Sequence, residues 1–255
     1  MDELNPKIIL AELLRPIEDA GFNETAHQVQ SIIGRILRYA VACGYCERDS
    51  TQDLKGALAP VVVKHRPTIV DKTKIGRLIT DIHSYQGSVS VTFALRVLPY
   101  VFVRPGELRH AQWHEIDLEA ALWTIPAEKM KMRSRHLVPL STQVVSILTE
   151  LKKNTGPDGF LFPGARTKCK PISDVAINAA LGYLGYARDE ICGHGFRAMA
   201  STLLNEMGFA SDWIERQLAH CERNNVRAAY NHAEYLPERR KMMQQWADFL
   251  DSLRA

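Results

Sequence analysis

Residues 194–230 read HGFRAMASTLLNEMGFASDWIERQLAHCERNNVRAAY. Four side chains of this stretch could take part in chemistry: His194, Arg197, His220 and Tyr230. His194 and Arg197 are three positions apart, at the start of a predicted helix that ends at Gly208. Positions three apart share one face of a helix, so both side chains should project from its first turn. The first turn also carries exposed amides and the positive end of the helix dipole, and it is therefore predicted to bind phosphate.

A second, short helix is predicted between this one and the phenol. Asp212 and Glu215 have the spacing of a capping box, which predicts a helix that begins at Asp212 and ends at His220. A histidine at a helix end is usually only a capping residue. The tyrosine ten residues further on, Tyr230, is what gives His220 a possible role in chemistry. Tyrosine has a pKa of about 10, so it needs cationic neighbours to attack as a phenolate.

Upstream, an apolar run from Leu95 to Val103 is followed by Arg104 and then by Pro105-Gly106. The Pro-Gly pair either breaks the helix or starts another one at Glu107. A partly buried guanidinium needs a partner. Glu107, three residues later, is expected to orient Arg104 when no ligand is bound, and it is assigned this supporting role instead of proton transfer.

Residues 121–125 and 136–140 read as two short strands joined by a basic turn. Basic side chains alternate through this turn, and alternate residues of an extended chain share a face. The four charges are therefore predicted to meet something anionic; a solvated hairpin tip is the alternative. They are Lys129, Lys131, Arg133 and Arg135.

Six side chains of these motifs could break a phosphodiester. Guanidiniums bind the non-bridging oxygens through paired, charge-assisted hydrogen bonds. A phenol can attack phosphorus, while imidazole and ammonium groups move protons to and from the attacking and leaving oxygens. The six candidates are Arg104, Lys131, His194, Arg197, His220 and Tyr230.

These motifs resemble those of the tyrosine recombinase (phage integrase) family, and most closely the prophage and genomic-island integrases. The matching segments are Val103–Leu108, His194–Arg197 and Leu218–His220, with Tyr230 downstream and a basic hairpin between the first two. One such motif would be weak evidence, whereas four in the family's order are specific. The resemblance runs from about Ala26 to Leu250 and so covers nearly the whole chain.

The resemblance implies a role for each residue. Arg104 and Arg197 would clamp the scissile phosphate, and His220 would donate to a non-bridging oxygen. His194 would assist proton transfer at the nucleophile. Lys131, with Lys129 as the reserve, would protonate the leaving 5′-hydroxyl.

The resemblance makes Tyr230 the nucleophile, and Tyr235 fits the family spacing less well. Tyr230 would form a 3′-phosphotyrosyl link, which the 5′-hydroxyl of a partner strand then attacks. Bond energy is kept in the link, so neither a cofactor nor ATP nor a metal is expected. The sequence shows no nucleotide-binding loop and no strong metal motif.

The expected fold is mainly α with a small β-hairpin or sheet. Residues 1–59 contain two amphipathic helical patterns, at 6–20 and 25–42, and by resemblance form a small helical domain that binds core DNA. Residues 60–70 read as a basic interdomain linker in which Lys64 and Arg66 would contact phosphates. Residues 71–255 would form the catalytic domain. Its last helix, 237–250, would pack either on this domain or on a neighbouring protomer.

Composition agrees with this interpretation. The 255 residues carry a net charge of +3, and no run of 18 apolar residues or signal-peptide pattern occurs. A protein without a membrane segment, in the bacterial cytoplasm and on the nucleoid when bound to DNA, is expected. Five irregularly spaced cysteines predict reduced thiols. Cys43 and Cys46 could suggest a zinc or redox site, but packing is the preferred interpretation and no metal site is predicted.

The partners implied by the resemblance are double-stranded attachment (core) sites and three further copies of the chain on synapsed DNA. An excisionase or a DNA-bending accessory protein is also implied. The alternatives are a type IB topoisomerase, a DNA-binding protein without catalysis, and a core fragment. A core fragment is an alternative because no N-terminal arm-binding domain is visible ahead of the helical bundle.

Overall fold

The computed structural model describes residues 5–62, 67–131, 133–220 and 234–254. The chain forms two compact units, Met1–His65 and Arg66–Ala255. Each unit has its own hydrophobic core. The predicted Lys64, Arg66 and Tyr230 lie outside the described residues.

The N-terminal unit is helical, as the two amphipathic patterns predict. Its elements are α1 (Pro6–Ile8), the π-helical turn η1 (Ile9–Leu14), α2 (Arg15–Asp19), α3 (Asn23–Ala42) and the 3-10 turn η2 (Ser50–Leu54). Asn5 caps the first helix by accepting a hydrogen bond from the amide of Ile8 at 3.0 Å. The apolar stripes of both long segments pack together with the end of the unit, burying Ile9, Leu14, Ala26, Leu37, Leu54 and Leu58.

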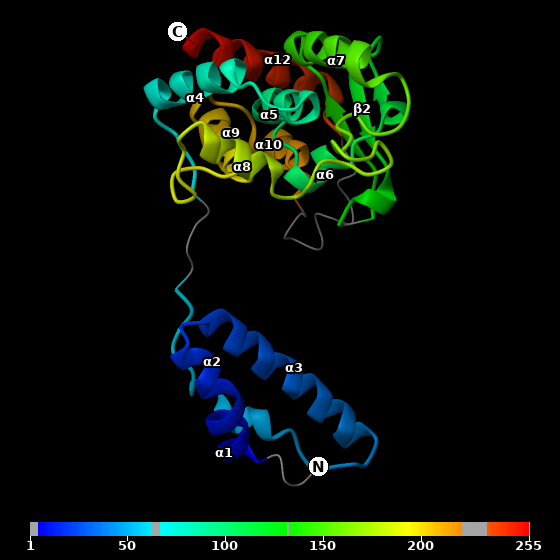
Figure 1. Ribbon diagram of the computed structural model, residues 1–255. Helices are drawn as coiled ribbons and strands as arrows, with labels where there is room; N and C mark the ends of the chain where they lie inside the picture. The colour runs from blue at the N-terminus through cyan, green and yellow to red at the C-terminus, as the bar shows by residue number, and fades with distance from the viewer. Residues whose placement is uncertain (1–4, 63–66, 132, 221–233, 255) are drawn as a thin grey trace. The chain divides into compact units, whose positions relative to one another are not determined.

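The C-terminal unit is mainly helical with one small sheet (Figure 1). Its helices are α4 (Lys72–Ser84), α5 (Val89–Val101), α6 (Pro105–Arg109), η3 (Trp113–Glu115), η4 (Ala127–Lys129), α7 (Thr142–Thr155), α8 (Ala176–Tyr183), α9 (Gly195–Glu206), α10 (Ser211–Gln217) and α12 (Leu236–Leu253). The strands are β1 (Ile116–Asp117), β2 (Leu122–Ile125) and β3 (His136–Pro139). They form an antiparallel sheet in the order β1-β2-β3, in which Leu122 pairs with Pro139 and Ile125 with His136. The two predicted strands are therefore confirmed.

Helix α5 forms the centre of this unit. It contacts α4, α6, α7, α8, α9 and α12, and its side chains are buried along most of its length. The helix is mostly apolar, as expected of a helix that is covered on most of its surface. It ends where Phe102 adopts a left-handed backbone (φ 36°), and this turn leads directly into Arg104.

The last helix, α12, packs against α4, α5 and β3 of its own unit (Figure 1). Its apolar face, Met242, Met243, Trp246 and Leu250, is at most 1% exposed. The indole nitrogen of Trp246 donates to the carbonyl of Pro99, inside α5, at 2.9 Å. This hydrogen bond joins α12 to α5. Of the two predicted environments for this helix, the described structure has packing on its own domain.

Candidate active site

Arg104 stands at the start of α6 and is held by Glu107. One carboxylate oxygen of Glu107 accepts from the backbone amide of Arg104 at 2.8 Å, and the other accepts from its Nη1 at 2.6 Å. Helix α6 therefore begins at Pro105, with Arg104 as its N-cap. Glu107 is only 8% exposed, so its charge is matched by the guanidinium. The predicted pairing of these two residues is confirmed.

Arg197 lies on the first turn of α9 and is 9% exposed. Its Nη1 donates to the carbonyl of Phe102 at 2.9 Å and its Nη2 to the carbonyl of Leu218 at 2.6 Å. Burial, and then the charge of Arg104, lowers the pKa of Arg197 to about 10. The guanidinium stays charged at neutral pH. Because burial disfavours its charge, a nearby anion would stabilise it.

The two arginines meet at the end of α10. Arg104 donates from Nη2 to the carbonyl of Ala219 at 3.2 Å, one residue after the carbonyl that binds Arg197. Ala219 has a left-handed backbone (φ 48°), which turns the chain so that consecutive carbonyls reach two different guanidiniums. Backbone oxygens thus hold both cations in place, and among the described residues Glu107 is the carboxylate that pairs with them.

His220 follows this turn and faces Arg197. Its Nε2 lies 3.3 Å from Nη2 of Arg197, and its Nδ1 lies 2.7 Å from a carboxylate oxygen of Glu215. Because guanidinium nitrogens only donate, Nε2 must accept and Nδ1 must carry the proton. Glu215 thereby fixes the tautomer of His220 and would stabilise an imidazolium.

The predicted capping box of α10 is wrong. The helix spans Ser211–Gln217 with Ala210 as its N-cap, so it begins one residue before Asp212 and ends three residues before His220. Glu215 pairs with His220 instead of the helix start. The capping-box spacing did not predict this contact, although Glu215 lies only five residues before the histidine.

His194 is the N-cap of α9 and is half-buried. The helix from His194 to the Gly208 turn is confirmed, with Gly208 at φ 84°. Gly195 is required because a Cβ there would lie 2.4 Å from the carbonyl of Pro67. The carbonyl of Gly195 also accepts from the hydroxyl of Thr68 at 2.8 Å, so the last part of the predicted linker packs against the helix start.

The four basic residues of the hairpin do not share one extended face, and that prediction is wrong. Lys129 lies in the 3-10 turn η4, and Arg133 has a left-handed backbone (φ 50°). Lys129 donates to the carbonyl of His110 at 2.8 Å and to the side-chain oxygen of Gln112 at 3.0 Å, and it pairs with Glu115.

The cause is the buried carboxylate of Glu115. It is 5% exposed and accepts from the indole of Trp123 at 3.0 Å, so its charge needs a cation inside the fold. Lys129 supplies that cation and is therefore a poor choice for contact with DNA or a leaving group. Lys131, Arg133 and Arg135 are exposed at the tip.

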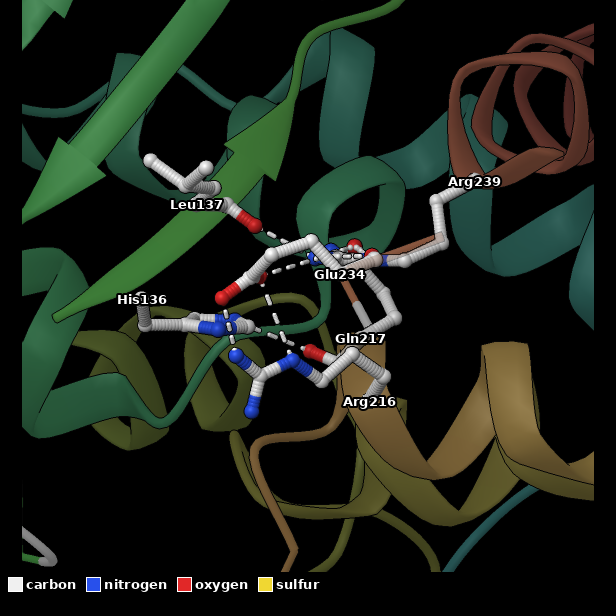
Figure 2. A network of polar contacts seen from close by, with 6 residues as sticks. All are labelled: His136, Leu137, Arg216, Gln217, Glu234 and Arg239. Atoms are coloured by element: carbon white, nitrogen blue, oxygen red, sulfur yellow. Dashed lines mark hydrogen bonds and ion pairs between the residues drawn. The ribbon is translucent and has the colours of Figure 1, made fainter. Parts of the chain in front are cut away.

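A buried polar cluster lies beside the site and was not predicted (Figure 2). Arg239 of α12 is 0% exposed and donates to Gln217 Oε1 from Nη2 at 2.6 Å and from Nε at 3.1 Å. It also donates to the carbonyls of Leu137 and Glu234, the latter at 3.2 Å. Burial, and then the charge of Arg216, lowers the pKa of Arg239 to about 10. The signal in the sequence was its place on the apolar stripe of α12.

Neither a membrane segment nor a metal cluster is found in the described part of the chain. No helix there is both long and apolar enough to cross a bilayer. No group of three or more histidine, cysteine or acidic side chains is placed to hold a metal ion within those same residues.

Residues 69–236 match the model of the phage integrase family, and residues 1–57 match that of the phage integrase central domain. The chain belongs to the phage integrase family. The chain is 40% identical over 253 residues to the integrase of Enterobacteria phage P4, in a match that covers 93% of this chain and 57% of the relative. It is 39% identical to the prophage integrase IntS of Escherichia coli K12, covering 95% of this chain and 63% of the relative. The chain thus spans about three fifths of the length of these two relatives.

Solved integrases share the fold. A lambda integrase dimer bound to a COC′ core site superposes with a TM-score of 0.67 at 18% identity, over 87% of this chain and 80% of that chain. The Tn1549 transposon integrase in complex with a circular intermediate DNA gives a TM-score of 0.71 at 13% identity, over 95% and 86% of the two chains. A lambda integrase tetramer bound to a Holliday junction gives 0.64 at 16% identity, over 88% and 66%.

Proposed function

We propose that this chain is the core of a site-specific DNA recombinase that integrates or excises a mobile element through a 3′-phosphotyrosyl intermediate. The observation that carries the proposal is the meeting of Arg104, Arg197 and His220 at the 218–220 turn. Two guanidiniums and an imidazole within hydrogen-bonding reach of one turn suit a phosphate with developing negative charge. Membership of the phage integrase family supports the same activity.

The first step would begin with phosphate binding. Arg104 and Arg197 would exchange part of their carbonyl contacts for the non-bridging oxygens of the scissile phosphate. The Phe102 and Leu218 carbonyls keep Arg197 oriented while this occurs. His220, held through Nδ1 by Glu215, would take up a proton at Nε2 and donate from there to one of these oxygens. Preorganised donors of this kind need little rearrangement as charge builds up in the transition state.

Bond exchange would follow from Tyr230. Its oxygen would attack phosphorus, forming a Tyr–phosphate bond as the bond from phosphorus to the 5′-oxygen breaks. His194 would assist removal of the phenolic proton, and Lys131 would protonate the leaving 5′-oxygen. In the second step the 5′-hydroxyl of the partner strand would attack the link and release Tyr230.

Further proposals concern partners and place of action. Double-stranded core-site DNA would be the substrate, and Lys64, Arg66, Arg133 and Arg135 would contact its phosphates. Four copies would act together on synapsed DNA, with an excisionase or DNA-bending protein as accessory, on the bacterial nucleoid. Residues 1–59, 60–70 and 71–255 would be the core-binding domain, the linker and the catalytic domain.

The test is formation of a covalent adduct on a nicked suicide substrate made from the flanks of the host element, in buffer with EDTA. We expect an adduct that maps to Tyr230 and is lost in Tyr230→Phe. The matched control is Tyr235→Phe, which should retain it. An adduct at Tyr235, or relaxation of supercoiled plasmid by a monomer without strand exchange, would contradict the proposal. DNA binding without any adduct would favour a non-catalytic fragment.

A further inference from the structure

The two ends of the segment that carries Tyr230 are tied together at their base. Arg216 of α10 precedes His220 by four residues, and Glu234 follows Tyr230 by four. Arg216 donates from Nε to Glu234 Oε2 at 3.2 Å, and its Nη2 pairs with Oε1. Arg216 and Glu234, which flank the segment that contains Tyr230 in the sequence, are therefore joined by a two-pronged ion pair.

A second contact closes the same base. Gln217, the last residue of α10, accepts two hydrogen bonds from Arg239, whose Nη1 also donates to the carbonyl of Glu234 at 3.2 Å. Figure 2 shows Arg216 and Arg239 on either side of Glu234, with Gln217 between the two helices. We name Arg216, Gln217, Glu234 and Arg239 the base clamp.

The base clamp is also fixed to the hairpin. Arg239 donates to the carbonyl of Leu137 on β3, and the neighbouring His136 donates from Nε2 to the carbonyl of Gln217 at 3.1 Å. Three consecutive carbonyls at the end of α10 thus bind His136, Arg197 and Arg104. Any movement of Gln217 would shift the turn that holds both phosphate-binding arginines.

We infer that the base clamp is a positioning device for Tyr230, an inference that rests on the proposed function. Four residues of extended chain span about 14 Å at most, so a fixed Glu234 limits how far the backbone of Tyr230 can lie from the base clamp. Without the clamp, the nearest fixed residue after Tyr230 would lie further along the chain, and this limit would be wider. The effective concentration of Tyr230 at the phosphate would then fall. None of the four clamp residues needs to touch DNA for this effect.

Glu234→Ala is the sharpest test. Its carboxylate is about one third exposed, so removing it opens the clamp without a cavity in the core. The matched control is Glu238→Ala, which makes the same charge change four residues later. The described structure gives Glu238 no hydrogen bond or ion pair. Arg239→Lys, which keeps the charge but not the fork of donors, is the second variant.

Single-turnover adduct formation should fall at least tenfold in Glu234→Ala and in Arg239→Lys. Glu234→Gln, which keeps one acceptor for Arg216, should be intermediate. The Kd for core-site DNA should stay within twofold of wild type in every variant, and amide exchange at residues 235–239 should accelerate in the first two only. Glu238→Ala should match wild type in each measurement.

Two results would overturn the inference. One is an adduct rate within twofold of the control in Glu234→Ala. The other is a rate that falls only in step with DNA affinity and Tm, which is what general destabilisation produces. Failure of the proposed function is a different result, because wild-type protein would then form no adduct at Tyr230 and the inference would fall with it.

Discussion

At the residue scale, the backbone around Ala219 connects Arg104 and Arg197, the two arginines proposed to bind phosphate. Its φ of 48° is in the left-handed region, where an L-residue with a Cβ costs about 1 kcal/mol. The strain is tolerated because this conformation points the carbonyls of Leu218 and Ala219 at Arg197 and Arg104. Local strain at a site of this kind persists where surrounding contacts fix it.

Substitutions at Ala219 should separate backbone geometry from side-chain chemistry. Ala219→Gly adopts this φ freely and should keep wild-type adduct formation, with a change in unfolding free energy below about 1 kcal/mol. Ala219→Val adds a β-branch at positive φ and should lose about 1–2 kcal/mol and at least tenfold in adduct formation. Urea unfolding and single-turnover cleavage measure the two effects. A valine variant with wild-type stability and rate would show that the turn is not strained.

At the element scale, the hairpin separates two lysines that the sequence presents as equivalent. Lys129 is turned into the fold against Glu115, whose side chain is 2% exposed, whereas Lys131 lies exposed at the tip. The 3-10 turn η4 causes the difference, because it reverses the direction of side chains that an extended strand would align.

Lys129→Met and Lys131→Met should therefore have opposite effects. The first leaves the Glu115 charge buried without its cation and should cost about 3 kcal/mol of unfolding free energy. The second should change stability by less than about 0.5 kcal/mol but lower adduct formation by about a hundredfold, because the leaving oxygen loses its acid.

A sulfur at the leaving 5′ position provides the control for these lysine variants. A thiol has a pKa of about 8.5 and leaves without an acid, so this substrate should restore cleavage by Lys131→Met. It should not improve the stability of Lys129→Met. If Lys129→Met were the variant rescued by sulfur, the assignment of the two lysines would be reversed.

Local signals predicted the elements well. Apolar periodicity predicted the helices of the N-terminal unit, and the glycine stop at Gly208 predicted the end of α9. Two short strands on either side of a basic turn predicted β2 and β3, and three-residue spacing predicted the pairing of Arg104 with Glu107. These features depend on residues near one another in the chain. The predicted start of α10 was wrong because the capping rule assigns Glu215 to the helix start, whereas its carboxylate forms a hydrogen bond with His220.

Contacts between distant elements could not be predicted in the same way. Arg239 and Leu137 are 102 positions apart, and no pattern within either segment announces the other. A sequence shows that an arginine interrupts the apolar stripe of α12 but not which carbonyls surround it. The base clamp and the convergence on the 218–220 turn therefore required the three-dimensional arrangement.

At the scale of the whole molecule, a buried histidine, His136, and a half-buried one, His83, should make folding sensitive to acid. Burial, and then the charges of Arg239 and Arg216, lowers the pKa of His136 to about 3. Burial, and then the charges of Arg254 and Arg96, lowers the pKa of His83 to about 4. His136 donates from Nε2 to Gln217 and is neutral in the folded protein.

The direction of the effect follows from proton binding. With an unfolded-state pKa of about 6.5, the unfolded chain takes up a proton at His136 between about pH 6.5 and 3 that the folded protein does not. Stability is therefore highest above pH 6.5 and falls as the pH drops below it. From pH 7.5 to 5.5 this one group should remove about 1.4 kcal/mol of unfolding free energy.

His136→Gln should isolate this contribution. The substitution lowers stability at every pH by removing the hydrogen bond to Gln217, but its loss between pH 7.5 and 5.5 should be smaller than that of wild type by about 1.4 kcal/mol. His83 remains in both proteins and contributes equally, so it cancels in the comparison. Urea unfolding of the two proteins at both pH values measures the difference. An equal loss in wild type and variant would mean that His136 titrates alike in the folded and unfolded chains, and that the charges of Arg216 and Arg239 do not reach it.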